Sequence, residues 1–196
     1  GPAGGRGARA RPWLDRALDH LEAGWRNEAA VLLADRALRA EGLLSGTGRA
    51  DMLLRKAARL DLLGRRSEQD ATTAEAALLA DAGGDPARRA RAHRSRGAWL
   101  WTVARHEEAE REFRLSGEIA RAAGDRRQEA AATGFLGNLA WALGRLEDAR
   151  EHYVRAGAAF REIGERGREG TALGTLGLVL HDIGRVIFFE KDKERY

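Results

Sequence analysis

Side chains that carry out catalysis are few in this chain and lack the spacing that catalysis requires. No two of its five histidines form a His-Glu-x-x-His zinc motif, and none of its four serines sits in a Gly-x-Ser-x-Gly turn. The short glycine motifs 134–137 and 174–177 fall inside apolar helical patterns, where they cannot cradle a phosphate. We therefore expect no enzyme, no cofactor, and no catalytic or metal-binding residue.

The remaining candidates are side chains suited to non-covalent recognition. Trp101 and Trp141 stand at equivalent positions of two successive sequence repeats, and tryptophan offers the large, rigid contact surface that is typical of binding hot spots. Asn138 can both donate and accept hydrogen bonds. Arg91 and Arg94 could each hold a carboxylate through two parallel hydrogen bonds. These residue types indicate binding of another molecule rather than its chemical conversion.

The basic residues do not form the surface that nucleic acid requires. Five arginines occur between residues 88 and 96, and the net charge is +4. A nucleic-acid surface would continue this run on neighbouring elements and interleave aromatic rings. The equivalent stretch of the next repeat, 128–136, has no basic residue, and 30 acidic residues are interspersed with 34 basic ones. We therefore expect no nucleic-acid partner, and the predominance of arginine is typical of a GC-rich genome.

Cysteine and long apolar runs are both absent from the sequence. Without cysteine there is no disulfide framework and no thiolate metal site. No apolar run approaches the roughly 18 residues of a membrane span, and no signal peptide is visible. These features predict a cytoplasmic protein without a membrane contact. Gly1 and Pro2 are typical of a scar left by tag removal, and residues 1–9 are expected to be flexible.

Small residues recur with a period of about 40 residues, and a period of this length is typical of repeat architectures. One column holds Gly24, Gly64, Ala104, Gly144 and Gly184. Two further columns contain Gly84, Gly124 and Gly164, and Ala17, Ala57, Gly97, Gly137 and Gly177. Glycine costs roughly 1 kcal/mol relative to alanine inside a helix, so its recurrence at one helical position indicates close helix–helix approach.

Each period is predicted to form two helices. Apolar residues at helical spacing, glycine at the helix ends, and Pro86 after Asp85 at one helix start support this prediction. The expected pairs are 12–23 with 27–41, 48–63 with 67–82, 86–103 with 106–123, and 127–143 with 146–163, followed by a single helix at 167–183. We expect an all-α domain at residues 10–185, comprising about four and a half repeats.

The repeat resembles the tetratricopeptide repeat (TPR), in a variant with long helices. The resemblance is carried by Leu136-Gly137, Ala140, Ala149, Tyr153 and Ala156. The small column would be Ala29, Gln69, Ala109 and Ala149, and the column after it Leu33, Thr73, Phe113 and Tyr153. The resemblance implies a right-handed α-solenoid and is also consistent with the repeat domains of bacterial regulators.

The resemblance further implies a concave groove lined by the first helix of each pair. The residues on that inward stripe would be Arg91, Arg94, Trp101, Gly134, Asn138, Trp141, Gly174 and His181. Asn138 would clamp the amide of an extended peptide, and the glycines would leave room beside it. The alternatives are that the tryptophans pack between repeats and that the arginines form a solvated face. Trp13 and Trp25 are expected to pack within the first repeat.

The segment 186–196 departs from the repeat pattern. Ile187 and Phe188 stand where the preceding repeat has acids, and Phe189 replaces a small packing residue. One hypothesis is a fused peptide that enters the groove of its own chain or of a neighbouring chain. The alternative is an irregular capping helix.

We therefore expect a protein-interaction module that binds an extended peptide or a partner helix. Two alternatives remain open. The chain could be the regulatory or sensor domain of a larger bacterial transcription regulator or kinase. It could also be a scaffold whose open repeat ends associate as a homo-oligomer.

Overall fold

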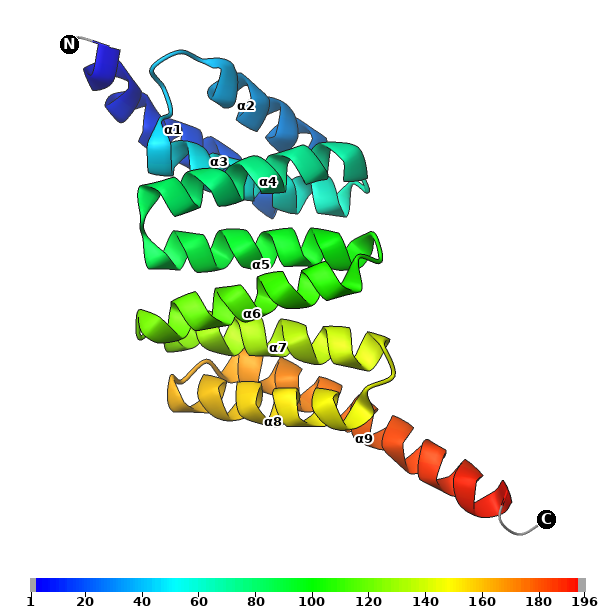
Figure 1. Cartoon of the computed structure of the whole chain (residues 1–196). Helices are drawn as coiled ribbons and strands as arrows, with labels where there is room; N and C mark the ends of the chain where they lie inside the picture. The colour runs from blue at the N-terminus through cyan, green and yellow to red at the C-terminus, as the bar shows by residue number, and fades with distance from the viewer. Residues whose placement is uncertain (1–2, 194–196) are drawn as a thin grey trace.

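The structure is a computed structural model that describes the backbone of residues 3–193 and the side chains of residues 10–186. All regular secondary structure in this range is helical, and consecutive helices lie antiparallel, side by side, in one stack (Figure 1). The helices are α1 (Ala3–Ala23), α2 (Asn27–Arg39), α3 (Gly46–Leu62), α4 (Arg66–Gly83), α5 (Pro86–Thr102), α6 (His106–Ala122), α7 (Arg126–Ala142), α8 (Leu146–Glu162) and α9 (Arg166–Lys193). The predicted all-α solenoid of helix pairs is confirmed.

Local signals in the sequence set the helix ends. The Asp85 and Asp125 side chains accept hydrogen bonds from the backbone N–H groups of Arg88 and Gln128, at 3.1 and 3.0 Å. Such N-caps satisfy donors that a helix start leaves unpaired. Glycines at 64, 84, 124, 144 and 164 adopt φ between +69° and +75°, which reverses the chain after each helix. Ala104 adopts φ +60° at the equivalent turn after α5, where a side chain is strained.

Glycine inside the first helix of a pair allows the second helix to approach closely. A Cβ at Gly97 of α5 would lie 2.7 Å from the Phe113 ring of α6. A Cβ at Gly137 of α7 would lie 3.2 Å from the Tyr153 ring of α8. Both aromatic rings are buried. At these two positions of the column, glycine is therefore required by an aromatic ring that packs against the helix backbone.

The first repeat is shorter than the later ones by a single residue. Its turn residue with positive φ is Trp25, at +56°, and not Gly24. Arg26 then corresponds to Arg65, because both backbone N–H groups bond back to the carbonyl five residues earlier. Leu18, Ala30 and Ala34 are buried where the sequence pattern placed Ala17, Ala29 and Leu33. The columns expected from the sequence are therefore displaced by one position in the first repeat.

This displacement also changes the environment of the first two tryptophans. Trp13 and Trp25 were expected to pack in the first repeat, but 71% and 75% of their surface is exposed. Leu14, Leu18 and Leu21 occupy the core face of α1 instead. The Arg16 guanidinium lies 5.3 Å from the Trp13 ring centroid on the outer face.

The two ends of the stack differ from the boundaries expected from the sequence. The backbone of residues 3–9 forms the first part of α1, and Gly1 and Pro2 lie outside the described residues. The expected turn at Gly184 is absent, because Gly184 does not adopt the positive φ of Gly144.

Helix α9 therefore continues through residues 186–193 and projects away from the stack (Figure 1). The side chains of 187–196 and the backbone of 194–196 lie outside the described residues. In the described part of the chain, no helix combines the length and apolarity needed to cross a membrane.

Candidate functional site

A hollow of about 170 Å³ lies between α7 and α9, with α8 as its floor. We call it the inner hollow. Its walls are mainly apolar and aromatic, and its polar groups are one amide, three hydroxyls and one guanidinium. The lining residues are Ala131, Gly134, Phe135, Asn138, Tyr153, Ala156, Phe160, Arg168, Thr171, Ala172 and Thr175. An apolar hollow with a few convergent polar groups is the usual composition of a ligand site.

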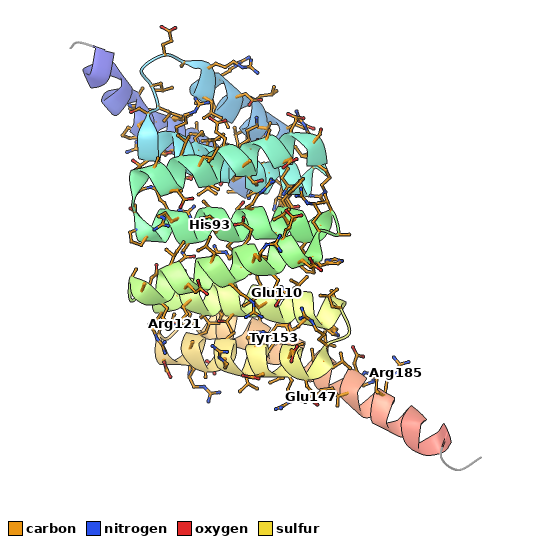
Figure 2. The ribbon with its side chains drawn as sticks, viewed as in Figure 1. His93, Glu110, Arg121, Glu147, Tyr153 and Arg185 are labelled. Carbon is orange, nitrogen blue, oxygen red and sulfur yellow. The ribbon has the colours of Figure 1, made fainter. Side chains whose placement is uncertain are left out.

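The polar groups of the inner hollow are oriented by bonds within the protein. The Tyr153 hydroxyl donates to Oδ1 of Asn138, across the contact between α8 and α7. Figure 2 shows Tyr153 where α7 and α8 meet. This bond uses one of the two lone pairs of the Asn138 amide oxygen, and it leaves both Nδ2 donors available to a ligand. Asn138 therefore brings amide donors to the wall of the hollow that α7 forms.

The threonine hydroxyl groups of α9 can accept hydrogen bonds, which complements the donors of Asn138. Thr171 donates to the Gly167 carbonyl and Thr175 donates to the Thr171 carbonyl, both at 3.0 Å. Each hydroxyl hydrogen is thus used within the helix, while the oxygen lone pairs remain able to accept. Burial raises the pKa of the Tyr153 phenol to about 12, so this group stays protonated at neutral pH. Donors from α7 and acceptors from α9 therefore face the same space.

Gly134 provides the room between these walls. A Cβ at Gly134 would meet no atom within 4 Å outside its own helix turn. The glycine is therefore not required by packing, unlike Gly97 and Gly137. Its effect is to widen the inner hollow at the centre of α7.

Arginines from three helices gather at the edge of the inner hollow. The half-buried Arg94 of α5 donates to the Gln128 amide oxygen, and its guanidinium lies 5.9 Å from the Phe135 ring centroid. Arg168 of α9 lines the hollow and lies 5.8 Å from the Phe160 ring centroid. The pKa of Arg94 is lowered to about 10, mainly by burial and in addition by the positive charges of Arg168, Arg91 and Arg127, while Asp125 opposes the shift.

The residues expected on the inward stripe divide into two groups. Gly134 and Asn138 line the inner hollow, and Arg94 borders it through Phe135. Five residues do not line it: Arg91, Trp101, Trp141, Gly174 and His181. The reason is that the hollow lies in the space between α7 and α9, whereas the predicted stripe followed the inward face of each helix separately.

The structure shows what the outlying residues contact. The Trp141 indole donates to Asp182 at 2.9 Å and packs against the buried cluster of α8 and α9, so it joins neighbouring repeats. Trp101 is half-buried against the cluster that contains Phe113 and Leu139. His181 and Gly174 are exposed, and the His181 Nδ1 lies 3.6 Å from the Asp182 carboxylate. Packing between repeats was the alternative interpretation of the tryptophans.

Several residues of the inner hollow were not assigned to a site from the sequence. Phe135 and Phe160 were not singled out from the sequence, and Tyr153 was noted only as part of the repeat pattern, because aromatic side chains at helical spacing usually pack inside. Arg168 lies one period after Gln128 and two periods after Arg88. This position in the repeat was the signal in the sequence that could have pointed to Arg168 as a site residue. Tyr153 and Phe160 are indeed buried, at 3% and 5% exposure, yet their edges line the hollow floor.

Two other depressions are built differently. One, of about 670 Å³, lies over the turns after α5 and α7 and contains the ion pairs of Arg105 with Glu108 and of Arg145 with Glu110. The other, about 250 Å³, lies between α6 and α8 over α7, where Thr133 and Leu136 replace the larger His93 and Arg96 of the previous repeat. It contains His152, whose Nδ1 makes no hydrogen bond within the described residues.

Among the residues that the structure describes, no three histidine, aspartate or glutamate side chains converge as a metal ion would require. The polar clusters of the stack are instead ion pairs between helices. His93 on α5 illustrates them: it lies between α4 and α6, with Nδ1 2.7 Å from Glu112 and Nε2 3.3 Å from Asp81 (Figure 2).

Comparison with solved structures identifies the fold. A Rap protein complexed with Competence and Sporulation Factor matches with a TM-score of 0.76 and 18% identity, over 91% of this chain and 50% of that one. BtubC from P. vanneervenii matches with a TM-score of 0.65 and 13% identity, over 91% of this chain and 83% of that one.

Kinesin light chain TPR-like repeats from Podosopora anserina match with a TM-score of 0.65 and 14% identity, over 91% of this chain and 98% of that one. The chain thus has a TPR-like solenoid fold and spans about half the length of the Rap protein. Neither family models nor curated proteins yield a match.

Proposed function

We propose that this TPR-like chain is a protein-interaction module that binds an extended peptide in the inner hollow. The observation that carries the proposal is that hydrogen-bond donors on α7 and hydrogen-bond acceptors on α9 line the same hollow. Asn138 on α7, with its Nδ2 donors, lines the same hollow as the hydroxyl oxygens of Thr171 and Thr175 on α9. An extended peptide backbone presents both carbonyl and N–H groups, which can bond to such donors and acceptors. Phe135 and Phe160 offer apolar surface to a peptide side chain.

The likeness to a Rap protein whose structure contains Competence and Sporulation Factor supports the same proposal. That factor is bound by a repeat protein whose structure superposes on 91% of this chain. The mainly apolar walls favour a peptide with one apolar anchor rather than a highly charged small molecule.

The proposal is tested by selecting binders from a random peptide library with the whole chain as bait. The affinity of the selected peptides is then measured by fluorescence anisotropy for the wild type and for Gly134→Leu. A Cβ at this position would meet no atom within 4 Å, and we expect the rest of a leucine side chain to take up space in the hollow. We expect it to weaken binding by at least about tenfold, which corresponds to about 1.4 kcal/mol.

Gly170→Leu is the matched control, because Gly170 is also an exposed helical glycine with no atom within 4 Å of an added Cβ. It lies on α9 but does not line the inner hollow. Its peptide affinity should equal that of the wild type. Equal affinities in all three proteins would place the peptide elsewhere and refute the proposal.

A second candidate is that the chain serves as the sensor part of a larger regulator, which was one of the alternatives. The observation in its favour is that the chain spans half of the Rap protein that it resembles. Peptide binding would then change the contact of the solenoid with another domain. Limited proteolysis of the full-length parent protein, with and without a selected peptide, tests this candidate, and identical cleavage patterns would count against it.

Self-association is a third candidate, and the register of α9 favours it. Ala140 of α7 is 2% exposed because α8 covers it, whereas Leu180, one period later, is 49% exposed. Leu173 and Leu178 are also exposed on α9. A second copy of the chain would cover this surface. Light scattering should then show a mass that rises with concentration in the wild type but not in Leu180→Glu, and a constant monomer mass in both would exclude it.

A further inference from the structure

The arginines at the edge of the inner hollow carry more positive charge than the protein neutralises. We call Arg91, Arg94, Arg127 and Arg168 the arginine cluster. Glu165 forms ion pairs with two of these arginines, Arg127 and Arg168, and Asp125 attracts Arg94, whereas Arg91 and Arg94 form no ion pair among the described residues. Four guanidinium groups against two carboxylates leave an excess of two positive charges beside an apolar hollow.

Neither carboxylate forms an ion pair with Arg94. Glu165 is contacted by Arg127 at 2.5 Å and by Arg168 at 3.0 Å, and Asp125 caps the start of α7 through the backbone N–H of Gln128 at 3.0 Å. Arg94 thus has an amide oxygen and an aromatic face as its neighbours instead of an acid. A guanidinium has five N–H donors, so Arg94 retains donors for a ligand.

A half-buried cation without an acidic partner is unfavourable in the free protein. The other arginines add to that cost, as the lowered pKa of Arg94 shows. An anion bound here would relieve both the desolvation and the mutual repulsion. Binding of such an anion is therefore more favourable, because it removes an electrostatic repulsion that already exists in the free protein.

The size of the charge excess indicates which anion fits. A carboxylate would neutralise one of the two excess charges, whereas a phosphate monoester carries close to two negative charges at neutral pH and offers three acceptor oxygens. Planar guanidinium groups match phosphate oxygens bidentately. We infer that the arginine cluster binds the phosphate group of a phosphorylated serine or threonine in the peptide that occupies the inner hollow.

This inference rests on the proposed peptide-binding function, and its geometry is consistent with a single ligand. Arg168 belongs both to the cluster and to the lining of the hollow. Arg94 lies against Phe135, whose other surface faces the hollow. A peptide anchored between α7 and α9 would thus bring a neighbouring residue to the cluster.

The test uses short probes that do not depend on the rest of the peptide. Acetylated, amidated Gly-phosphoserine-Gly is titrated against the whole chain at constant ionic strength, in parallel with Gly-Ser-Gly, Gly-Asp-Gly and inorganic phosphate. Side-chain Nε–H resonances of arginine, assigned by the loss of one signal in Arg94→Gln, report binding. The phosphotripeptide should bind saturably and at least about tenfold more tightly than the aspartate tripeptide.

Matched variants locate the site. Arg94→Gln and Arg168→Gln should each weaken binding of the phosphotripeptide by at least about tenfold. Arg161→Gln should leave it unchanged, because Arg161 is an exposed arginine of α8 that already pairs with Glu169 at 2.6 Å. Gly134→Leu should block selected peptides but leave the phosphotripeptide bound, which separates a failure of this inference from a failure of the proposed function.

Three results would overturn the inference. Equal affinity for the aspartate and phosphoserine tripeptides would refute the match to a dianion. Inorganic phosphate binding as tightly as the phosphotripeptide would assign the cluster to a free ion instead of a peptide residue. The absence of saturable binding by any probe would show that solvent alone neutralises the cluster.

Discussion

The ring of Phe113 packs directly against the backbone of Gly97, so that a Cβ added to Gly97 would lie 2.7 Å from Cδ1 and Cε1 of that ring. Phe113 is fully buried, and α5 and α6 surround it. The ring cannot move aside without disturbing its other neighbours, because protein interiors are close-packed. This contact fixes the distance between the two helices of the third repeat.

The first prediction compares two glycines of the same column. Gly97→Ala should lower the free energy of unfolding by about 1–3 kcal/mol, because overpacking against Phe113 exceeds the gain in helix propensity. Gly177→Ala, two periods later, should raise it by about 0.5–1 kcal/mol, since its Cβ would meet no atom within 4 Å. Urea denaturation of both variants checks this, and a common sign would contradict the packing argument.

The second prediction concerns the amide of Asn138. Asn138→Asp keeps an acceptor for the Tyr153 hydroxyl but removes the Nδ2 donors. Peptides selected on the wild type should therefore bind at least about tenfold more weakly to this variant, while its melting temperature changes little. Anisotropy titration and circular dichroism measure the two quantities. Unchanged affinity would mean that the amide nitrogen does not contact the peptide.

The third prediction separates binding from stability at Arg94. Burial of the guanidinium, together with the neighbouring arginines, lowers its pKa to about 10. Arg94→Met removes this unpaired charge but keeps a long apolar side chain against Phe135. The free energy of unfolding should equal that of the wild type or exceed it by up to about 1 kcal/mol. The reason is that removing an unfavourable charge from a functional site commonly preserves or raises stability. A clear loss of stability in urea would show that Arg94 has a structural role.

The fourth prediction is a pH dependence of stability that originates at His93. Burial opposes the charging of His93, but its hydrogen bonds and attraction to Glu112 and Asp81 outweigh this, so its pKa is raised. Arg89 also faces this group, through Asp81. A raised pKa in the folded state means that the stabilisation is complete below the unfolded value of about 6.5 and is lost as the pH rises through the folded pKa.

Unfolding in urea across the range from about pH 5 to pH 9 measures this effect. His93→Gln should flatten the decline on the alkaline side. His181→Gln is the control, since His181 is exposed. The same alkaline decline in His93→Gln as in the wild type would assign the effect to another group.

The third and fourth repeats could be predicted closely from the sequence, whereas the first could not. Columns of glycine mark both the turns and the close contacts of α5 to α8, since a missing side chain has a direct geometric meaning there. In the first repeat the turn falls on Trp25, with Gly24 just before it. A strained non-glycine turn leaves no compositional signal, so the shift of one position became visible only in the packing of Leu18 and Ala34.

The sequence by itself determined that this chain is a stack of helix pairs, and it singled out Gly134 and Asn138, which line the inner hollow, and Arg94, which borders it. Helical periodicity and turn glycines are local properties, so one sequence is enough to predict them. Three relations were decided only by the tertiary structure. The Trp141 indole bonds to Asp182 of the next repeat, the Tyr153 hydroxyl donates to the Asn138 oxygen, and the charge of Arg168 acts on Arg94. These relations depend on the distance and rotation between non-adjacent helices, which packing sets and which periodicity does not specify.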